Sequence, residues 1–368
     1  MTGTLQFVTM VLAATTVIAT LLLFAVKLWH RMVLAGREAR TASYTAAVGD
    51  MISRGYIPSQ IPRRWRTDPL FHSVLIDYRK LLTGVEVAYI DTLVERFGIV
   101  DALMPRIRKL FPPTSRLQAV ATIVELADRK AAPLLISLLD DHQGFVRTYA
   151  AHGLARMDQV SSVPVILDLS NNVRPWEAGR LTDALVAFGP RAVAPIVSWI
   201  EAEVAHNFSV DVVAQAARVL GLIGDSAAEP VLLDLLTRSS PKLRLAAASA
   251  LARVGTDAAT QPLLRAFSDE SWEVRARAVR ALAALADASV AADVARLLSD
   301  PEWWVRQNAA ESLAQIPGGK DHLLAAIDST DRFAADAALN QLAELRMLPE
   351  GRTPTLSQPP GLQAAGRT

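Results

Sequence analysis

The 368-residue sequence contains no cysteine, which excludes disulfide bonds, thiolate metal sites and cysteine nucleophiles. Aromatic residues make up only 6% of the chain, while alanine and leucine recur throughout, a balance that favours helices packed through small side chains over a sheet-based core. A basic excess is also missing, since 38 Lys and Arg stand against 37 Asp and Glu. Nucleic-acid-binding proteins normally carry such an excess, so we predict no nucleic-acid partner.

The longest uncharged run lies near the N-terminus. Residues 5–26 contain no charged side chain, and about 20 apolar residues of helix suffice to cross the hydrocarbon core. Trp29 follows at a depth suited to lipid headgroups. A cleaved signal peptide would need basic residues ahead of a shorter run, and none precedes this one. The sequence therefore predicts an uncleaved transmembrane helix over residues 5–29.

The segment that follows is strongly basic. Residues 27–66 contain eight Lys and Arg against two acidic residues, Glu38 and Asp50, so 8 − 2 gives a local excess of +6. Positively charged flanks remain on the cytoplasmic side of a membrane. We therefore predict a single-pass protein of the inner (plasma) membrane of a bacterium, with its N-terminus outside, a basic juxtamembrane linker over residues 30–66, and the rest of the chain cytoplasmic.

Four residues of this flank allow a second interpretation. Arg63, Arg64, Trp65 and Arg66 combine arginine with tryptophan, a mixture that suits anionic lipid headgroups, where each basic residue contributes about 1 kcal/mol near the surface. The simpler interpretation is a solvated linker whose charge only fixes the topology. Both hypotheses stay open from the sequence.

An internal repeat of about 31 residues fills most of the remaining chain. Residues 243–251 (LRLAAASAL), 274–282 (VRARAVRAL) and 305–313 (VRQNAAESL) share the pattern apolar-Arg-x-x-Ala-small-x-x-Leu, and residues 146–154 (VRTYAAHGL) match it too. The closing apolar residues are spaced by 31, 31, 35, 31, 31 and 31 positions: Ile123, Leu154, Leu185, Leu220, Leu251, Leu282 and Leu313. A shorter copy with Arg332, Ala335 and Leu339 follows.

Each repeat predicts a helical hairpin. Asp300 and Pro301 are suited to begin a helix, and the apolar positions of residues 305–313 fall four apart, on one helical face. Such a hairpin hides its apolar face only by stacking on its neighbours. We therefore predict an all-α fold, an α-solenoid over residues 113–345 preceded by a helical capping unit over residues 67–112. The tail over residues 349–368, rich in Pro, Gly, Thr and Gln, is predicted to be disordered.

The pattern resembles the HEAT repeat, in particular the HEAT-like repeats of the phycobilin lyases. In that family an aspartate before the first helix and an arginine within it form a ladder between adjacent units. The positions that match are Arg116, Arg147, Arg244, Arg275, Arg306 and Arg332 for the arginine, and Asp141, Asp269 and Asp300 for the aspartate. Ala178 and Val213 stand where arginine is expected, so the resemblance implies an interrupted ladder there, and a four-residue insertion near His206 is expected to bend the array.

No residue pattern indicates chemistry of its own. The six histidines lack metal-ligand spacing, and acid pairs such as Asp140-Asp141 stand at helix starts, where carboxylates cap backbone N–H groups. The stretch 317–320 (PGGK) lacks the first glycine and the Ser or Thr of a phosphate-binding loop. We therefore predict that the chain is not an enzyme and holds no catalytic residue, cofactor or metal.

The tryptophans are the remaining candidates for a functional site. Trp272 and Trp303 occupy the same position in successive units, with Trp304 beside the second, and Trp176 and Trp199 mark another aromatic place. Packing between units is the simpler explanation. The alternative is an exposed aromatic patch that anchors a partner.

These features favour a membrane-anchored scaffold whose cytoplasmic solenoid binds a protein partner in the same membrane, for example a polysaccharide-making glycosyltransferase. One alternative, implied by the family resemblance, is a bilin lyase-like enzyme or chromophore chaperone. The other is binding of anionic lipid or another polyanion through the basic juxtamembrane segment, residues 54–66.

Overall fold

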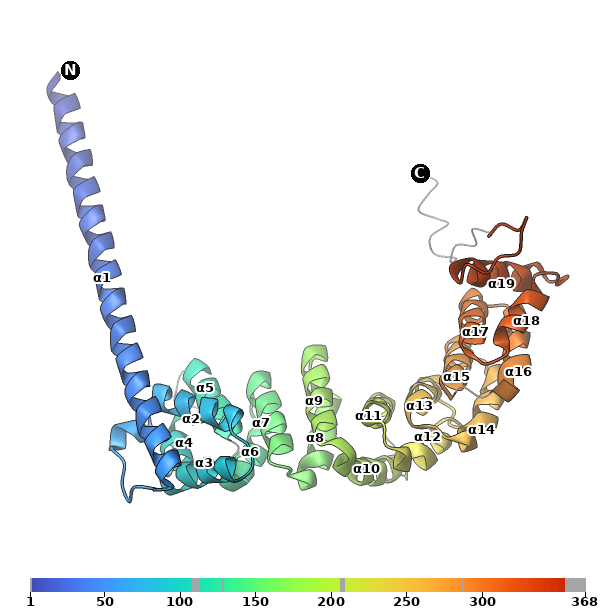
Figure 1. The fold of residues 1–368 in the computed structure, drawn as a ribbon, viewed down its shortest axis with the longest axis horizontal. Coiled ribbons are helices and arrows are strands. Elements are labelled where there is room, and N and C mark those ends of the chain that lie inside the picture. The colour runs from blue at the N-terminus through green and yellow to red at the C-terminus, as the bar shows by residue number, and fades with distance from the viewer. Residues whose placement is uncertain (1, 108–112, 127–128, 206–208, 286–287, 355–368) are drawn as a thin grey trace. The chain divides into compact units, whose positions relative to one another are not determined.

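The computed structural model describes residues 2–107, 113–126, 129–205, 209–285 and 288–354 (Figure 1). Every regular element within these ranges is a helix, which confirms the predicted all-α class. The chain divides into two compact units, Met1–Pro133 and Leu134–Thr368. The insertion near His206 and residues 355–368 of the predicted disordered tail lie outside the described residues.

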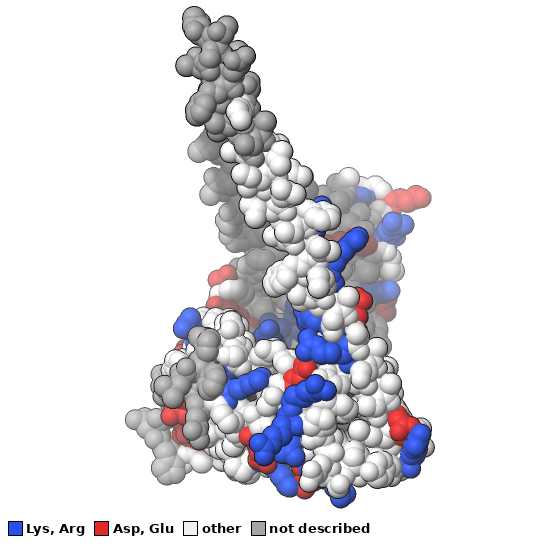
Figure 2. Space-filling view, turned by 90° about the vertical axis from the view of Figure 1, so that its left-hand side faces the viewer, with Lys and Arg blue, Asp and Glu red and all other residues white. Residues whose placement is uncertain are grey.

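The first unit begins with α1 (Thr2–Arg54), an uninterrupted helix of 53 residues. Its part from Thr15 onward is long and apolar enough to cross a membrane, with a mean hydropathy of 1.7 over its most apolar stretch, none of which is buried. Exposed leucines such as Leu21 and Leu22 line this part. In Figure 2 the described upper part of α1 shows no charged side chain, and Lys and Arg gather over the part below it.

The predicted linker over residues 30–66 is wrong for its first part, because α1 continues to Arg54. Tyr44, Val48 and Met51 lie on one face of the helix and are buried, and this end of α1 packs against α2 (Pro69–Leu81). The Tyr89 hydroxyl donates hydrogen bonds of 2.7 Å to the carbonyl oxygens of Met51 and Tyr56. These contacts hold the lower part of α1 as a rigid portion of the first unit.

The rest of the first unit consists of short helices. They are the 3-10 turn η1 (Arg63–Arg66), α2, α3 (Val85–Arg96), α4 (Ile99–Ile107) and α5 (Pro113–Leu126), and α6 (Ala132–Leu138) contains the division between the two units. Large side chains such as Phe71, Ile90 and Leu103 form the core of this unit.

The second unit consists of helical hairpins in two layers (Figure 1). The first-helix layer contains α7 (Gly144–Arg156), α9 (Pro175–Ala187), α11 (Val210–Ile223), α13 (Pro241–Val254), α15 (Trp272–Leu285), α17 (Trp303–Gln315) and α19 (Arg332–Glu344). The second-helix layer contains α8 (Val163–Leu169), α10 (Val193–Ala205), α12 (Glu229–Leu235), α14 (Thr260–Arg265), α16 (Ala291–Arg296) and α18 (Gly319–Ala326). Each helix of the first layer packs on the next one along the chain, which is the stacking that the repeat predicts.

Small residues allow this stacking to be close. A Cβ atom added to Gly221 of α11 would lie 2.7 Å from Cα of Ala250 on α13, so the two backbones approach each other more closely than any larger pair would permit. The high alanine content therefore reflects the contact between first helices, where side chains of little volume suffice to exclude water.

The register predicted for the last repeat is wrong. Arg332, Ala335 and Leu339 were expected to match Arg306, Ala309 and Leu313, but the residues of α19 that are buried four apart are Ala334, Ala338 and Leu342. These align with Val305, Ala309 and Leu313 of α17, which are also buried. The unit is thus 29 residues long, so Phe333 occupies the position of Trp304, and Ala335, not Arg332, occupies the position of Arg306.

Candidate functional site

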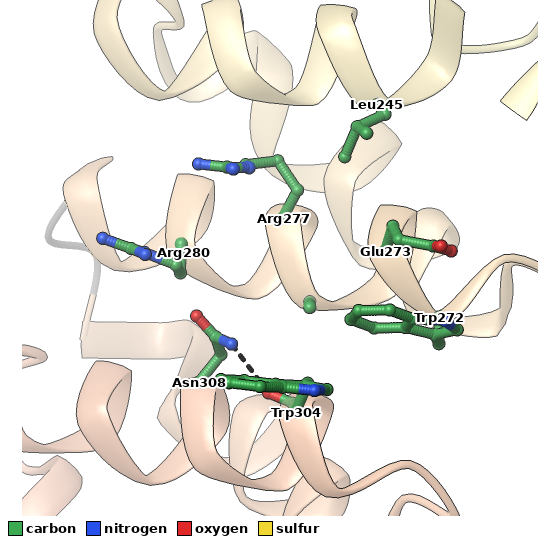
Figure 3. A pocket seen from close by; sticks show the side chains of 8 residues that line it. Leu245, Trp272, Glu273, Arg277, Arg280, Trp304 and Asn308 are labelled. Carbon is green, nitrogen blue, oxygen red and sulfur yellow. Dashed lines mark hydrogen bonds between the residues drawn. The ribbon is translucent and has the colours of Figure 1, made fainter. Parts of the chain in front are cut away.

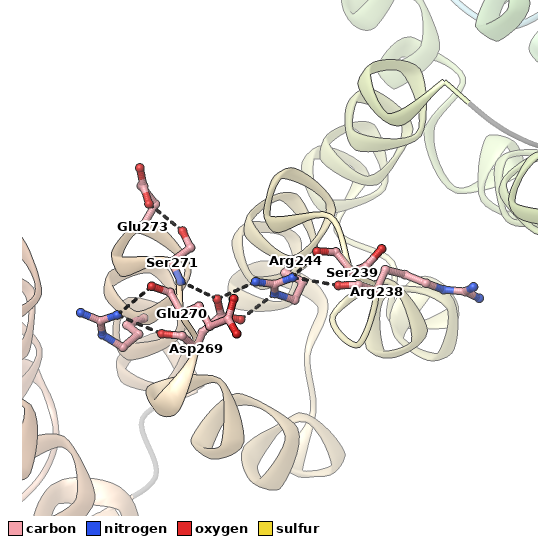
Figure 4. A network of polar contacts seen from close by, with 8 residues as sticks. Arg238, Ser239, Arg244, Asp269, Glu270, Ser271 and Glu273 are labelled. Atoms are coloured by element: carbon pink, nitrogen blue, oxygen red, sulfur yellow. Dashed lines mark hydrogen bonds and ion pairs between the residues drawn. The ribbon is translucent and has the colours of Figure 1, made fainter.

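Two rungs of the predicted ladder join consecutive first helices. Arg244 donates to both carboxylate oxygens of Asp269 at 2.6 and 2.8 Å, and Arg275 makes the same bidentate contact with Asp300 at 2.8 and 2.8 Å. Figure 4 shows the Arg244 rung, in which the third guanidinium nitrogen, Nη1, donates to the carbonyl oxygens of Arg238 and Ser239. Planar, two-point contacts of this kind fix the geometry between neighbouring units.

Hydrogen bonding keeps both groups of the Arg244–Asp269 rung charged, although burial acts against it. Hydrogen bonding to Asp269 raises the pKa of Arg244. Burial acts to raise the pKa of Asp269, but the hydrogen bonds from Arg244 and the Ser271 N–H hold it below its usual range. Both groups of the rung therefore remain charged over the physiological pH range.

The other predicted ladder residues have different surroundings. Arg147 pairs with Glu177, a carboxylate that the sequence analysis did not single out. Buried Arg306 donates to the carbonyl oxygens of Asp300 and Pro301 and lies 4.7 Å from the centre of the Phe333 ring. Arg332 is not a rung, since its side chain is 88% exposed and lies 3.8 Å from Asp336 on its own helix.

The first two predicted ladder residues, Arg116 and Asp141, belong to different compact units. Arg116, in the first unit, is buried and donates to the Ile107 carbonyl oxygen at 2.9 Å. Asp141, in the second unit, is buried and accepts from the Gln143 N–H at 2.9 Å.

Where arginine is replaced by Ala178 and Val213, neutral contacts join the helices. Gln215 of α11 donates to the carbonyl oxygen of Ala178 at 3.3 Å and to the Thr182 hydroxyl at 3.0 Å, both on α9. This part of the second unit therefore stacks without a buried ion pair between its first helices.

One position of the first helices exposes aromatic rings. Phe145, Trp176, Trp304 and Phe333 occupy equivalent positions in α7, α9, α17 and α19, and they are between 38% and 60% exposed. The equivalent positions of the three helices between them hold charged residues: Asp211, Lys242 and Glu273. We call these seven residues the aromatic row. Large exposed rings rimmed by polar residues are typical of protein-binding surfaces.

Ring contacts organise both ends of the aromatic row. Phe145 and Trp176 are 4.6 Å apart between ring centroids, and Trp303 meets Trp304 edge to face, also at 4.6 Å. Between these ends, Lys242 forms an ion pair with Asp211. Trp176 and Trp304 could be recognised from the sequence as candidate partner contacts, whereas Phe145 and Phe333 were not among the predicted residues. Phe145 directly precedes a Val-Arg pair as Trp304 does, so the repeat alignment contained the signal for it.

A groove of about 370 Å³ lies beside the C-terminal end of the row (Figure 3). It is lined by residues of three successive first helices: Leu245 of α13, Trp272, Glu273, Ala276, Arg277 and Arg280 of α15, and Trp304 and Asn308 of α17. Two of the predicted tryptophans, Trp272 and Trp304, therefore face one groove. The half-buried Trp303 packs against Trp304 outside it.

A family model of HEAT repeats matches residues 100–185, 197–270 and 260–343. The chain belongs to the HEAT-repeat family. The matched region begins before the predicted first repeat at residue 113, and it extends over the whole ladder and the aromatic row up to residue 343.

Solved structures similar to this HEAT-repeat protein include human deoxyhypusine hydroxylase in complex with glycerol, at 18% identity and a TM-score of 0.30, covering 76% of this chain and 97% of that one. Kap95p in its complex with RanGDP shares 13% identity at a TM-score of 0.47, and the match covers 77% of this chain but only 46% of Kap95p. The complex of CpcE and CpcF of phycocyanin lyase from Nostoc sp. PCC7120 shares 19% identity at a TM-score of 0.25, with 78% and 98% covered. No curated protein sequence matches the chain.

Trp199 is not part of the aromatic row of this HEAT-repeat protein. It lies on α10, in the second-helix layer, and its indole N–H donates to Asp168 at 2.8 Å. The prediction that grouped it with Trp176 is wrong, because the hairpin places α9 and α10 in different layers.

The basic segment Arg63–Arg66 forms η1, and its tryptophan has a packing role. Trp65 lies 5.1 Å from Tyr44 and 5.0 Å from Phe71 between ring centroids, so it closes the core around the end of α1. Tyr44 is 18 residues beyond Val26, which corresponds to about 27 Å of helix. The headgroup region is only about 5–7 Å thick, so lipid binding through these arginines requires a strongly tilted α1.

One buried histidine makes the first unit sensitive to acid. His72 lies 2.9 Å from the Arg66 carbonyl oxygen, and burial, followed by the charge of Arg106, lowers its pKa although that hydrogen bond opposes the change. The unfolded chain therefore binds a proton below its ordinary pKa of 6.5 more readily than the folded chain does. Stability that is present above pH 6.5 is lost as the pH falls.

We expect hydrogen exchange in α2 to accelerate when the pH-corrected measurement moves from pH 7.5 to 5.5, and a His72→Gln variant to lose most of this dependence. The ionisation of Asp68, whose pKa is lowered as well, acts only at lower pH and leaves this window unaffected. An equal pH dependence in the variant would show that His72 is not responsible.

Proposed function

We propose that this HEAT-repeat protein is a membrane-anchored scaffold that binds a partner protein through its first-helix layer and has no catalytic activity of its own. The aromatic row carries the proposal. Four rings at equivalent positions remain between 38% and 60% exposed, although the buried apolar positions of the stacked hairpins are filled by other residues. Aromatic anchors of this kind account for much of the binding energy in protein interfaces.

The proposed membrane anchor limits where in the cell the protein can bind its partner. The exposed apolar part of α1 is the proposed membrane span, and the basic residues from Lys27 to Arg66 favour a cytoplasmic solenoid. Because anchoring raises the local concentration of a bound protein near the bilayer, a partner in the same membrane fits best. A membrane enzyme such as a glycosyltransferase is one such partner.

Site-directed crosslinking tests this function, and the absence of cysteine makes the design simple. A Lys242→Cys variant places a benzophenone label on the first-helix layer, and an Ala292→Cys variant places the same label on the second-helix layer. In native membranes we expect the Lys242→Cys probe to capture one protein that mass spectrometry identifies. The purified protein should then bind the full-length chain directly.

The control is a chain that carries only residues 1–66 with the same label. If neither probe enriched a protein over this control, or if the identified protein failed to bind after purification, the scaffold function would be wrong. Capture through Ala292→Cys alone would place the binding surface on the other layer.

A further inference from the structure

Two guanidinium groups, those of Arg277 and Arg280, line the groove beside Trp304. Within the described part of the chain, neither forms an ion pair or hydrogen bond, whereas Arg244 and Arg275 pair with carboxylates. Partial burial, and then the charge of Arg280, lower the pKa of Arg277. A half-buried, unpaired guanidinium beside another cation is unfavourable until an anion reaches it.

The other residues that line the groove limit the kind of molecule that can carry this anionic group. Trp272 and Trp304 present indole rings to the groove (Figure 3), a surface for an apolar or aromatic side chain. Asn308 donates its amide N–H to the Trp304 carbonyl oxygen at 2.7 Å, which leaves its side-chain oxygen to accept a hydrogen bond. A peptide backbone supplies the N–H donor for that oxygen, whereas a phosphodiester backbone has none.

Glu273 also favours a peptide over a nucleic acid as the ligand of the groove. Its carboxylate lines the groove at the end opposite Arg280 (Figure 3) and accepts from the Ser271 hydroxyl at 2.6 Å. A polyanion such as a nucleic acid would be repelled there. A peptide that places one carboxylate near the arginines and an uncharged residue near Glu273 fits the charge pattern.

We propose that the groove formed by α13, α15 and α17 binds an extended acidic peptide segment of the partner, with a carboxylate side chain on Arg277 and Arg280 and an aromatic side chain between Trp272 and Trp304. Arg277 and Arg280 lie five and eight residues beyond Trp272 on α15, which corresponds to about 7.5–12 Å along the helix. An extended chain advances about 3.3 Å per residue, so the acidic and aromatic residues stand about three positions apart. This inference rests on the proposed scaffold function and specifies the chemistry of its partner.

The direct test is fluorescence anisotropy with the full-length protein in detergent. The probe is a fluorescein-labelled peptide, Gly-Ser-Glu-Glu-Ser-Gly-Phe-Ser-Gly, for which we expect a Kd of roughly 10–100 μM. Replacing both Glu residues by Gln, or Phe by Ala, should weaken binding on the order of tenfold, and higher salt should weaken it as well. Equal binding of a single-stranded oligonucleotide would overturn the proposal.

An equivalent residue elsewhere on the first-helix layer provides a matched control. Arg277→Gln combined with Arg280→Gln, or Trp304→Ala alone, should weaken peptide binding on the order of tenfold. Arg218→Gln in α11, at the position of Arg280, should leave it unchanged. Circular dichroism of each variant separates lost binding from lost folding.

Crosslinking with the Lys242→Cys probe separates the two proposals. Loss of the captured partner in the Arg277→Gln, Arg280→Gln background would support the groove. Unchanged capture together with unchanged peptide affinity would overturn the groove and leave the scaffold function standing. No peptide binding by the unmodified chain would also overturn the groove, whatever partner is captured.

Discussion

Replacing Asp300 by alanine is expected to lower the free energy of unfolding of the hairpins around α15 and α17 by about 3–5 kcal/mol, the usual cost of leaving a buried charge without its partner. The Arg275 side chain is only 12% exposed, and Asp300 is 5% exposed. The substitution also removes the acceptor of the Glu302 N–H at the start of α17. Urea denaturation with hydrogen exchange resolved by peptide measures the loss, because a stack of repeats can open locally.

The last repeat contains a matched control for this prediction. Asp336→Ala removes the carboxylate near Arg332, whose side chain is 88% exposed, and it should cost less than about 1 kcal/mol, as exposed ion pairs do. Replacing Arg275 by Met and Asp300 by Leu together should recover much of the stability, because no unpaired charge then remains. If Asp300→Ala and Asp336→Ala had equal effects, the buried rung would not hold the units together.

Two rungs of the ladder, Arg244–Asp269 and Arg275–Asp300, could be predicted because their residues recur at fixed spacing. The rung made by Arg147 could not, because Glu177 occupies the position that is apolar in neighbouring units, as in Val146 and Val212. Its burial is possible because Gly144 leaves room, and a Cβ there would collide with the Glu177 carboxylate. The Arg147–Glu177 pair depends on residues of two successive helices, α7 and α9. No sequence pattern within a single repeat therefore reveals it.

The error in the last repeat has a similar physical origin. The segment 334–338 reads AADAA, so alanine satisfies the repeat pattern in more than one register. Only burial in the stacked helices distinguishes Ala334 and Ala338 from Ala335. Phe333 could therefore be assigned to the aromatic row only from the structure, whereas Trp304 and Trp272 could be identified from the sequence.

The predicted linker rested on the charge of residues 27–66 and did not take into account which apolar side chains within them pack against the first unit. Arginines dominate residues 27–66, but Tyr44, Val48 and Met51 recur at helical spacing within them and are buried. The lower end of α1 is thus fixed in the first unit, and its exposed apolar part is the span that we propose to cross the bilayer.

Introducing arginine at both Val17 and Leu21 is therefore expected to release the protein from the membrane. Each arginine near the centre of a spanning helix costs about 2.5–3.5 kcal/mol, so the pair costs about 5–7 kcal/mol. After carbonate extraction, the variant should move from the membrane pellet to the soluble or aggregated fraction. The solenoid itself should retain its helical structure, because both side chains are exposed and contact no other helix.

A second pair on the same helix controls for charge alone. Ala35→Arg combined with Ala39→Arg has the same spacing of four residues at exposed positions beyond Lys27, and it should leave the protein in the pellet, because this part of α1 lies outside the proposed span. If the Val17 and Leu21 variant also stayed in the pellet, α1 would not span the bilayer. Release of both variants would mean that total charge, not the position along the helix, governs attachment.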